Sequence, residues 1–201
     1  YPAAWSCLAS ILSSRSLKIT KRILLIHHEA RQPYFFYAKF ERYIDKKIQE
    51  SATDIVTDSL ANRQSLIDFR SFDVKRLPIQ IIYPGIDTDQ LNLSSDFSLR
   101  DYIGVDEDTL LFGTLGRVEK YKGHDDLIKA FSMLSDQDKE KAIIVFIGSG
   151  LDNEITRLKT IAKKNNAEKY VIFTGYLKAN VFDLIAQLDL LLSMTKDFEG
   201  F

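Results

Sequence analysis

Two basic residues beside glycines are the first candidates for chemistry. Arg117 follows Gly116 directly after an apolar run, and Lys122 lies five residues further on, before Gly123. A guanidinium can hold a diphosphate through two parallel hydrogen bonds, and an ammonium adds a compact positive charge beside it. A solvated basic loop is the alternative from charge alone. The position directly after a predicted strand favours phosphate binding.

Two further loops carry glycines that would let a ligand approach the backbone. Gly148-Ser149-Gly150 begins like a dinucleotide-binding fingerprint, but Asn153 occupies the third glycine position. A lone pair of glycines after a strand is equally typical of a tight turn. Gly175 follows the next apolar run. Together with the two cations, these small residues indicate a phosphorylated ligand.

Two titratable residues lie where a catalytic group could act. His28 ends an apolar run beside His27 and Glu29, and a histidine there can donate, accept or carry a proton near neutral pH. Taken alone, a histidine at a strand end is more often structural. Glu199 lies in a polar loop after the last apolar run, and from the residues alone it reads as a surface acid.

Paired acids raise the question of a metal ion. Asp87 with Asp89, and Asp106 with Asp108, have the spacing of metal-binding Asp-x-Asp pairs. Both pairs lie in turn-like segments, where paired acids are usually solvated, and such Mg²⁺ sites also need substrate phosphates beside them. The chain contains no His/Cys cluster with zinc spacing. We therefore expect no metal ion and no cofactor.

The elements that must position these groups alternate between strands and helices. Near-continuous apolar strands separated by helices predict an α/β fold with parallel sheets covered on both faces. Ligands bind such sheets at the carboxyl ends of the strands. The predicted strands span 23–26, 54–57, 79–83, 110–115, 143–147, 171–174 and 188–192.

Helices fill the intervals between these strands. A helix over 34–51 would place its apolar residues at helical spacing. These residues are Phe36, Phe40, Tyr43, Ile44 and Ile48. A second helix follows the strand at 54–57. Asp125, Asn153 and Asn180 are predicted to cap the starts of three later helices.

An irregular stretch divides the chain. Residues 84–100 contain Pro, Gly, Asp and Ser with little periodicity and predict a linker between domains at 1–83 and 101–201. Residues 1–83 carry 13 Lys and Arg against 8 Asp and Glu, and the rest carries 14 against 20. The asymmetry is consistent with different partners for the two halves or with ordinary surface variation. The missing initiator Met and the ending Glu199-Gly200-Phe201 predict an internal fragment.

Between Ile79 and Phe201 the chain carries a series of short motifs in a specific order and spacing over about 120 residues. The motifs are Ile82–Asp87, Leu115-Gly116-Arg117, Tyr121-Lys122-Gly123, Ile147–Gly150, Phe173-Thr174-Gly175 and Glu199-Gly200-Phe201. Through these motifs this part of the chain resembles family 4 retaining glycosyltransferases of the GT-B fold. The first half matches more loosely, through the strand ending at His28 and the stretch after Asp54.

The resemblance implies two incomplete Rossmann-like domains, the first for the acceptor and the second for the nucleotide sugar. Arg117 and Lys122 would neutralise the donor diphosphate. Glycines of the strand-end loops would make room for the nucleotide, namely Gly116, Gly148, Gly150 and Gly175. Glu199 matches the first acid of the family's paired-glutamate motif, and the second would lie beyond Phe201. His28 matches the acceptor-domain histidine, chosen over His27 because Glu29 follows it.

The implied activity is transfer of a sugar from a nucleotide sugar to a glycan or lipid-linked acceptor, with retention of configuration and without metal. The fragment alone would be inactive. A nucleotide-sugar epimerase or hydrolase, or a non-catalytic nucleotide-binding module, remains open, whereas the absent third glycine argues against a nicotinamide-dependent oxidoreductase.

No nucleic-acid partner is expected. The resemblance implies a cytoplasmic protein of polysaccharide biosynthesis. The aromatic-basic stretch 34–47 leaves open a peripheral contact with the inner face of the membrane, although packing in the core is a simpler explanation of its aromatic residues.

Overall fold

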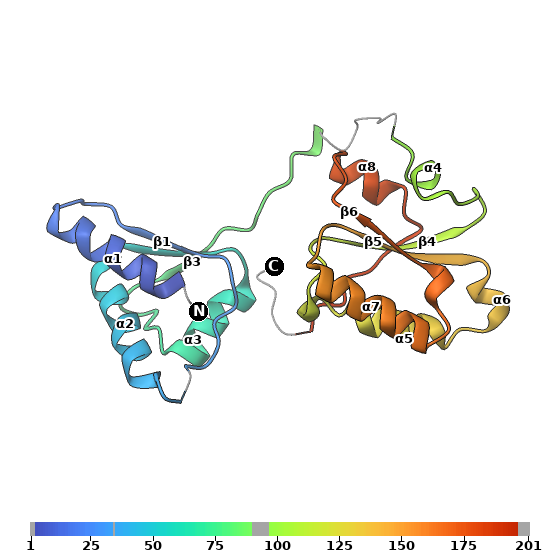
Figure 1. The fold of residues 1–201 in the computed structure, drawn as a ribbon. Helices are drawn as coiled ribbons and strands as arrows, with labels where there is room; N and C mark the ends of the chain where they lie inside the picture. The colour runs from blue at the N-terminus through green and yellow to red at the C-terminus, as the bar shows by residue number, and fades with distance from the viewer. Residues whose placement is uncertain (1–2, 34, 90–96, 197–201) are drawn as a thin grey trace. The chain divides into compact units, whose positions relative to one another are not determined.

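The chain forms two compact units, each built on a parallel sheet (Figure 1). The computed structural model describes residues 3–33, 35–89 and 97–196. Along the chain, the boundary between the units falls between Gly85 and Ile86. The predicted linker 84–100 therefore includes residues of the second unit, and its last two residues already belong to a helix.

The first unit contains a sheet with the order β1-β2-β3. Its strands are β1 (Ile23–Ile26), β2 (Asp54–Thr57) and β3 (Ile79–Ile81), and its helices are α1 (Ala3–Ser16), α2 (Ala38–Ser51) and α3 (Leu60–Arg70). All four residues of β1 pair with β2. Exposed and buried residues alternate along β1, whereas the last three residues of β2 are all buried. Buried aliphatic residues such as Ile44, Ile48, Ile55 and Leu66 form one core between sheet and helices.

Helix α2 departs from the sequence prediction in its start and in the face that it buries. It begins at Ala38 rather than at 34. Ile44 and Ile48 are buried as predicted, but Phe36, Phe40 and Tyr43 are exposed. Phe36 lies before the first turn of the helix, and Phe40 and Tyr43 lie inside it but stay 43% and 54% exposed. Core packing therefore does not explain them.

The second unit contains a sheet with the order β6-β5-β4-β7. Its strands are β4 (Leu110–Leu115), β5 (Ala142–Ile147), β6 (Val171–Gly175) and β7 (Leu190–Leu191). All strand pairs are parallel, and β4 pairs with β5 over six residues. The helices and short 3₁₀ turns are α4 (Leu99–Ile103), η2 (Lys120–Lys122), α5 (His124–Ser132), α6 (Asp136–Lys139), α7 (Asp152–Lys164), η3 (Glu168–Tyr170) and α8 (Val181–Ala186).

Both faces of this second sheet are covered, as the apolar strands predicted. Ile144 and Phe146 of β5 belong to a core that includes residues of α5 and α7, whereas Val145 and Ile147 belong to another that includes residues of α4 and α8. This division follows from the alternation of side chains along a strand. Figure 1 shows α5 and α7 together on one side of the sheet and α8 on the other.

The helix starts test the predicted caps. Asn180 caps α8 as predicted, because its side chain accepts a hydrogen bond from the backbone N–H of Phe182 at 2.8 Å. The other two predicted caps are wrong, since α5 follows Gly123 and α7 follows Leu151, which places Asp125 and Asn153 inside the first helical turn. Acids in a first turn still interact favourably with the helix dipole. The strands predicted over 79–83 and 188–192 are shorter, at Ile79–Ile81 and Leu190–Leu191.

Candidate functional site

The strand order of the second sheet creates a topological switch point. From β4 the chain adds β5 and β6 on one side and then returns to place β7 on the other side of β4. In open α/β sheets, ligands bind at the carboxyl ends of the strands where the order reverses in this way. The crevice after β4 and β7 is therefore the first place to look for a site.

A pocket of about 180 Å³ lies at this switch point. Arg117 and Lys122, the predicted phosphate-binding residues, both line it, together with Gly116, which is predicted to make room for the nucleotide. Its opposite wall comes from the end of β7 and the segment that follows. The lining residues are Thr114, Leu115, Gly116, Arg117, Lys122, His124, Ile185, Leu191, Leu192, Ser193, Met194 and Thr195.

A second, larger pocket of about 680 Å³ adjoins the loops after β4 and β5. Arg117 and Gly150 line it, together with Glu119, Tyr121 and the first residues of α7. Arg117 thus borders both pockets, whereas Gly148 and Gly175 line neither of them.

The two predicted phosphate-binding side chains differ in their surroundings. The Arg117 side chain is 72% exposed, and its Nη1 lies 2.6 Å from Oε1 of Glu119. A bound diphosphate would therefore compete with Glu119 for the guanidinium. The Lys122 Nζ lies 5.3 Å from the centroid of the Tyr121 ring. Both cations lie in the loop between β4 and α5, which brings them to the same pocket.

Two of the glycines at the strand ends, Gly148 and Gly150, are required by close packing against other protein atoms. The N–H of Gly148 donates to the Gly175 carbonyl at 3.0 Å, and the N–H of Gly116 donates to the Ile147 carbonyl at 2.9 Å. A Cβ on Gly148 would lie 2.0 Å from the Gly116 oxygen, and a Cβ on Gly150 would lie 2.7 Å from Val118. Protein atoms are therefore sufficient to account for the absence of a side chain at Gly148 and Gly150, and their contact with a nucleotide stays a prediction.

The wall after β7 is tied to the loop that carries Lys122. The N–H of Lys196 donates to the Tyr121 carbonyl at 2.8 Å. The Met194 carbonyl approaches Gly123 so closely that a Cβ there would lie 2.0 Å from its oxygen. Gly123 also has a φ of +72°, so both its conformation and its neighbour favour glycine. The two sides of the switch-point pocket are thus held together by backbone contacts.

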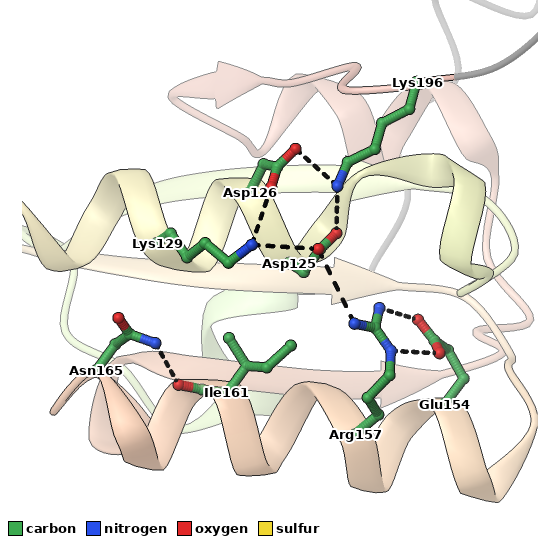
Figure 2. Close-up of polar contacts among 8 residues, drawn as sticks. All are labelled: Asp125, Asp126, Lys129, Glu154, Arg157, Ile161, Asn165 and Lys196. Carbon is green, nitrogen blue, oxygen red and sulfur yellow. Dashed lines mark hydrogen bonds and ion pairs between the residues drawn. The ribbon is translucent and has the colours of Figure 1, made fainter.

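Side chains reinforce this connection (Figure 2). The Lys196 Nζ lies 2.9 Å from Oδ1 of Asp125 and 2.7 Å from Oδ2 of Asp126, both in the first turn of α5. Arg157 of α7 approaches Asp125 at 3.9 Å and pairs with Glu154 at 2.6 Å. Hydrogen bonds to the two carboxylates raise the pKa of Lys196. Sequence reasoning did not single out Lys196. The only signal in the sequence was the two adjacent acids, Asp125 and Asp126, near a predicted helix start.

His124 is a second residue that sequence reasoning missed. It is the first residue of α5, is only 4% exposed and lines the switch-point pocket. Its Nδ1 has no hydrogen-bond partner among the described residues, and its ring meets Phe146 edge-on at 4.9 Å. Burial lowers the pKa of His124, with the Glu119 carbonyl opposing this effect. The neutral ring is therefore favoured near neutral pH.

The predicted acceptor-side histidine lies at the carboxyl end of β1 in the first unit. The structure places both His27 and His28 in exposed positions. Nδ1 of His27 lies 3.4 Å from Oδ2 of Asp58, whose side chain is nearly buried and also accepts a hydrogen bond from Asn62. The sequence choice of His28 over His27 stays a prediction, while the geometry gives His27 a carboxylate partner. Glu199 lies outside the described residues.

The acidic pairs considered for a metal lie in turns of the chain. The N–H of Asp89 donates to Oδ1 of Asp87 at 3.1 Å, as in a turn closed by an aspartate side chain. At the second pair, the backbone carbonyl of Asp106 accepts hydrogen bonds from Arg100 and from the N–H of Thr109, which closes a turn around Asp108. Within 3–33, 35–89 and 97–196, no group of three His, Cys, Asp or Glu side chains gathers to hold a metal ion. Independence from metal stays a prediction.

With this geometry established, comparison with known proteins identifies the family. The family model described as "Glycosyl transferases group 1" matches residues 96–201, which is more than half of the chain and contains the whole switch-point pocket. The chain belongs to the group 1 glycosyl transferases.

Curated relatives of this group 1 glycosyl transferase include proteins named as a glycosyltransferase and as a synthase. A D-inositol 3-phosphate glycosyltransferase of Corynebacterium jeikeium is 24% identical over 168 residues, which cover 80% of this chain and 38% of the relative. A mannosylfructose-phosphate synthase of Agrobacterium fabrum is 31% identical over 114 residues, covering 53% of this chain and 25% of the relative. The chain therefore spans well under half the length of these relatives.

Solved structures confirm the fold. Alr3699/HepE of Anabaena, crystallised in complex with UDP, matches with a TM-score of 0.79 at 20% identity, over 96% of this chain and 51% of that chain. WaaG, a glycosyltransferase involved in lipopolysaccharide biosynthesis, matches with a TM-score of 0.70 at 16% identity, over 92% of this chain and 56% of that chain. The α/β prediction of two partial Rossmann-like parallel sheets of GT-B type is confirmed.

Proposed function

We propose that the protein containing this chain transfers a sugar from a nucleotide-sugar donor to an acceptor. The observation that carries this proposal is the presence of Arg117 and Lys122 in one pocket at the switch point of the second sheet. Two cations from a single loop match the charge of a diphosphate, and the Gly116 backbone lies open beside them. The second unit would thus bind the donor and the first unit the acceptor.

In the proposed reaction, the bond between the anomeric carbon and the diphosphate oxygen breaks, and the nucleoside diphosphate leaves with the electron pair. The acceptor hydroxyl forms the new bond to the anomeric carbon, and its proton passes to the leaving phosphate oxygen. Arg117 and Lys122 would stabilise the negative charge that develops on the leaving group. Retention of configuration, proposed from the family 4 resemblance, fits attack from the face that the diphosphate leaves.

UDP is the donor nucleotide to test first, because Alr3699/HepE is described in complexes with UDP and with UDP-glucose. The acceptor would present a hydroxyl on a sugar, a glycan or a lipid-linked acceptor. Acceptor dependence distinguishes transfer from the alternatives, because an epimerase or hydrolase consumes the nucleotide sugar without an acceptor and a binding module does not consume it. The anomeric configuration of the product, read by NMR, tests retention.

The decisive experiment uses the complete protein and calorimetry. UDP, GDP, ADP and NAD are titrated in parallel in buffer with Mg²⁺ and in buffer with EDTA, so that metal-independent binding is measured. Binding of one nucleoside diphosphate is expected, and Arg117→Ala should weaken it by about 10- to 100-fold, the scale of a lost charge-assisted hydrogen bond.

Lys163→Ala supplies the matched control, because this exposed lysine of α7 lines neither pocket. It should bind the nucleotide as the parent protein does. Preferential binding of NAD, or equal affinity in the Arg117→Ala and Lys163→Ala proteins, would overturn the proposal. Loss of binding only when EDTA is present would instead contradict the proposed independence from metal.

A further inference from the structure

The segment before α2 and the outward side of this helix expose a group of aromatic rings. Phe35 and Phe36 are 90% and 91% exposed, and their rings contact each other with centroids 5.6 Å apart. Tyr37, Phe40 and Tyr43 continue the exposed aromatic surface into the helix. Side chains of this size are normally buried, so five exposed aromatic residues within nine positions indicate an interaction surface.

Cations lie among these rings on the same helix. Lys39, Arg42 and Lys46 are exposed, and they lie three, four or seven residues apart. Residues at this spacing are neighbours on one side of a helix. We define the aromatic-basic face as these eight exposed side chains: Phe35, Phe36, Tyr37, Lys39, Phe40, Arg42, Tyr43 and Lys46.

The acidic residues of α2 do not belong to the aromatic-basic face. Arg70 of α3 pairs with Glu41 at 2.8 Å and with Asp45 at 2.7 Å. The side chains of Arg70 and Asp45 are each 2% exposed, so these charges are neutralised inside the unit. The remaining acid of α2, Glu50, pairs with Lys47 at 2.9 Å. The helix sequence mixes both signs, but its outward face carries only positive charge.

We infer that the aromatic-basic face docks the protein onto an anionic lipid bilayer. Lys and Arg beside an anionic surface gain electrostatic attraction, while Phe and Tyr bury their rings at the level of the headgroups. A protein partner with an acidic surface would match the cations, but the exposed Phe35–Phe36 pair fits the apolar part of a bilayer interface. The contact would be peripheral, because no helix in the described part of the chain is long and apolar enough to cross a membrane.

Docking does not depend on the proposed sugar transfer and can be measured without substrate. The complete protein is mixed with vesicles of phosphatidylcholine alone or with phosphatidylglycerol added, and the bound fraction is measured by flotation. Binding to the anionic vesicles is expected. The triple variant Lys39→Gln/Arg42→Gln/Lys46→Gln should bind on the order of 10- to 100-fold more weakly, and Phe35→Ser/Phe36→Ser should weaken binding about tenfold or more.

A triple variant of α7, Lys159→Gln/Lys163→Gln/Lys164→Gln, is the matched control, since it removes the same charge from exposed positions on the other unit. It should keep at least half of the parent's affinity for anionic vesicles. Circular dichroism and UDP titration of each variant establish that the fold and the donor site are intact. No binding to anionic vesicles, or equal losses in both triple variants, would overturn the inference.

A spectroscopic test addresses the alternative that another part of the complete protein covers this face. The Phe36→Trp variant adds a tryptophan whose fluorescence reports on this face. Without vesicles, its emission should resemble that of an exposed indole and should be quenched by acrylamide. When anionic vesicles are added, its emission should shift to the blue. Emission that is already blue-shifted and shielded from acrylamide before vesicles are added would show a protein-covered face and overturn the inference.

Discussion

The Nζ atom of Lys196 lies 2.9 Å from Oδ1 of Asp125, and this ion pair joins the segment after β7 to the first turn of α5 (Figure 2). Because Lys196 is separated from Asp125 by 71 positions, the pair closes a long loop of the chain. Ser193, Met194 and Thr195, directly before the lysine, form one wall of the switch-point pocket. Lys196 is therefore in a position to hold that wall against the loop bearing Arg117 and Lys122.

Removal of this ion pair should loosen the pocket wall. We predict that Lys196→Ala lowers UDP affinity by about two- to fivefold, the effect expected for a partly exposed ion pair. Lys196→Arg should retain most of the affinity. Lys129→Ala is the control, because Lys129 pairs with Asp125 and Asp126 from within α5 and ties no second segment to them. Calorimetry showing equal losses for Lys196→Ala and Lys129→Ala would contradict the role of Lys196.

The strand-end glycines should differ in their tolerance of a side chain. Gly148→Ala places a Cβ 2.0 Å from the Gly116 oxygen at a φ of +143°, so a loss of stability of about 3 kcal/mol or more is expected. Gly175→Ala meets no atom within 4 Å but has a φ of +70°, and it should cost about 1 to 2 kcal/mol. Urea unfolding measures both.

Gly85→Ala serves as the reference for these two variants, because its Cβ would meet nothing within 4 Å and its φ is not in the left-handed region. It should unfold at the same urea concentration as the parent. If Gly148→Ala were as stable as Gly85→Ala, packing at the strand ends would not explain the glycine, and the predicted contact with a nucleotide would become its remaining explanation.

The fold was predictable because the apolar strands form local patterns. Runs such as Leu110–Leu115 and Val171–Thr174 are continuous and short, and such runs between helices specify a parallel sheet without knowledge of distant contacts. The same local reasoning failed at Phe36 and Phe40. Helical spacing indicates which residues share a side of a helix, but several sides of α2 carry apolar residues, and only tertiary packing selects the one with Ile44 and Ile48.

The candidate site was predictable only in part, for a related reason. Arg117 and Lys122 lie close in sequence beside glycines, so a local motif revealed them. Lys196 became visible only when the crossover to β7 brought it to α5. His124 follows Gly123 directly, yet the sequence does not show that its ring is buried against Phe146. Long-range pairing and burial are properties of the folded chain rather than of a motif.

The buried His124 predicts a pH dependence of stability. Burial lowers its pKa from the ordinary value of 6.5, so the unfolded chain binds a proton more readily than the folded chain. Stability from the neutral ring is therefore fully present above pH 6.5 and is lost as the pH falls through the folded-state value. We predict a smaller fall in Tm between about pH 7.5 and 5.5 for His124→Phe than for the parent. Equal slopes in the two proteins would contradict this assignment.

The histidines after β1 allow the acceptor-side role to be tested residue by residue. The resemblance to family 4 enzymes assigns the role to His28, so His28→Ala should lower the rate of sugar transfer by about 100-fold or more, as for loss of a catalytic proton-transfer group, while UDP affinity stays unchanged. His27 has a different environment, because Nδ1 lies 3.4 Å from the carboxylate of Asp58. His27→Ala should lower transfer less, because His27 would at most orient the loop that carries His28.

The variant Asp58→Asn further distinguishes the roles of His27 and His28. It removes the carboxylate charge beside His27 while leaving His28 in place, so its activity should follow that of His27→Ala and not that of His28→Ala. Transfer rates and UDP affinities of the three variants would be measured with one donor and one acceptor. A large loss in both His27→Ala and Asp58→Asn, with normal turnover by His28→Ala, would move the acceptor-side role to the His27–Asp58 pair. A carboxylate that orients an imidazole would then be the physical basis of the role.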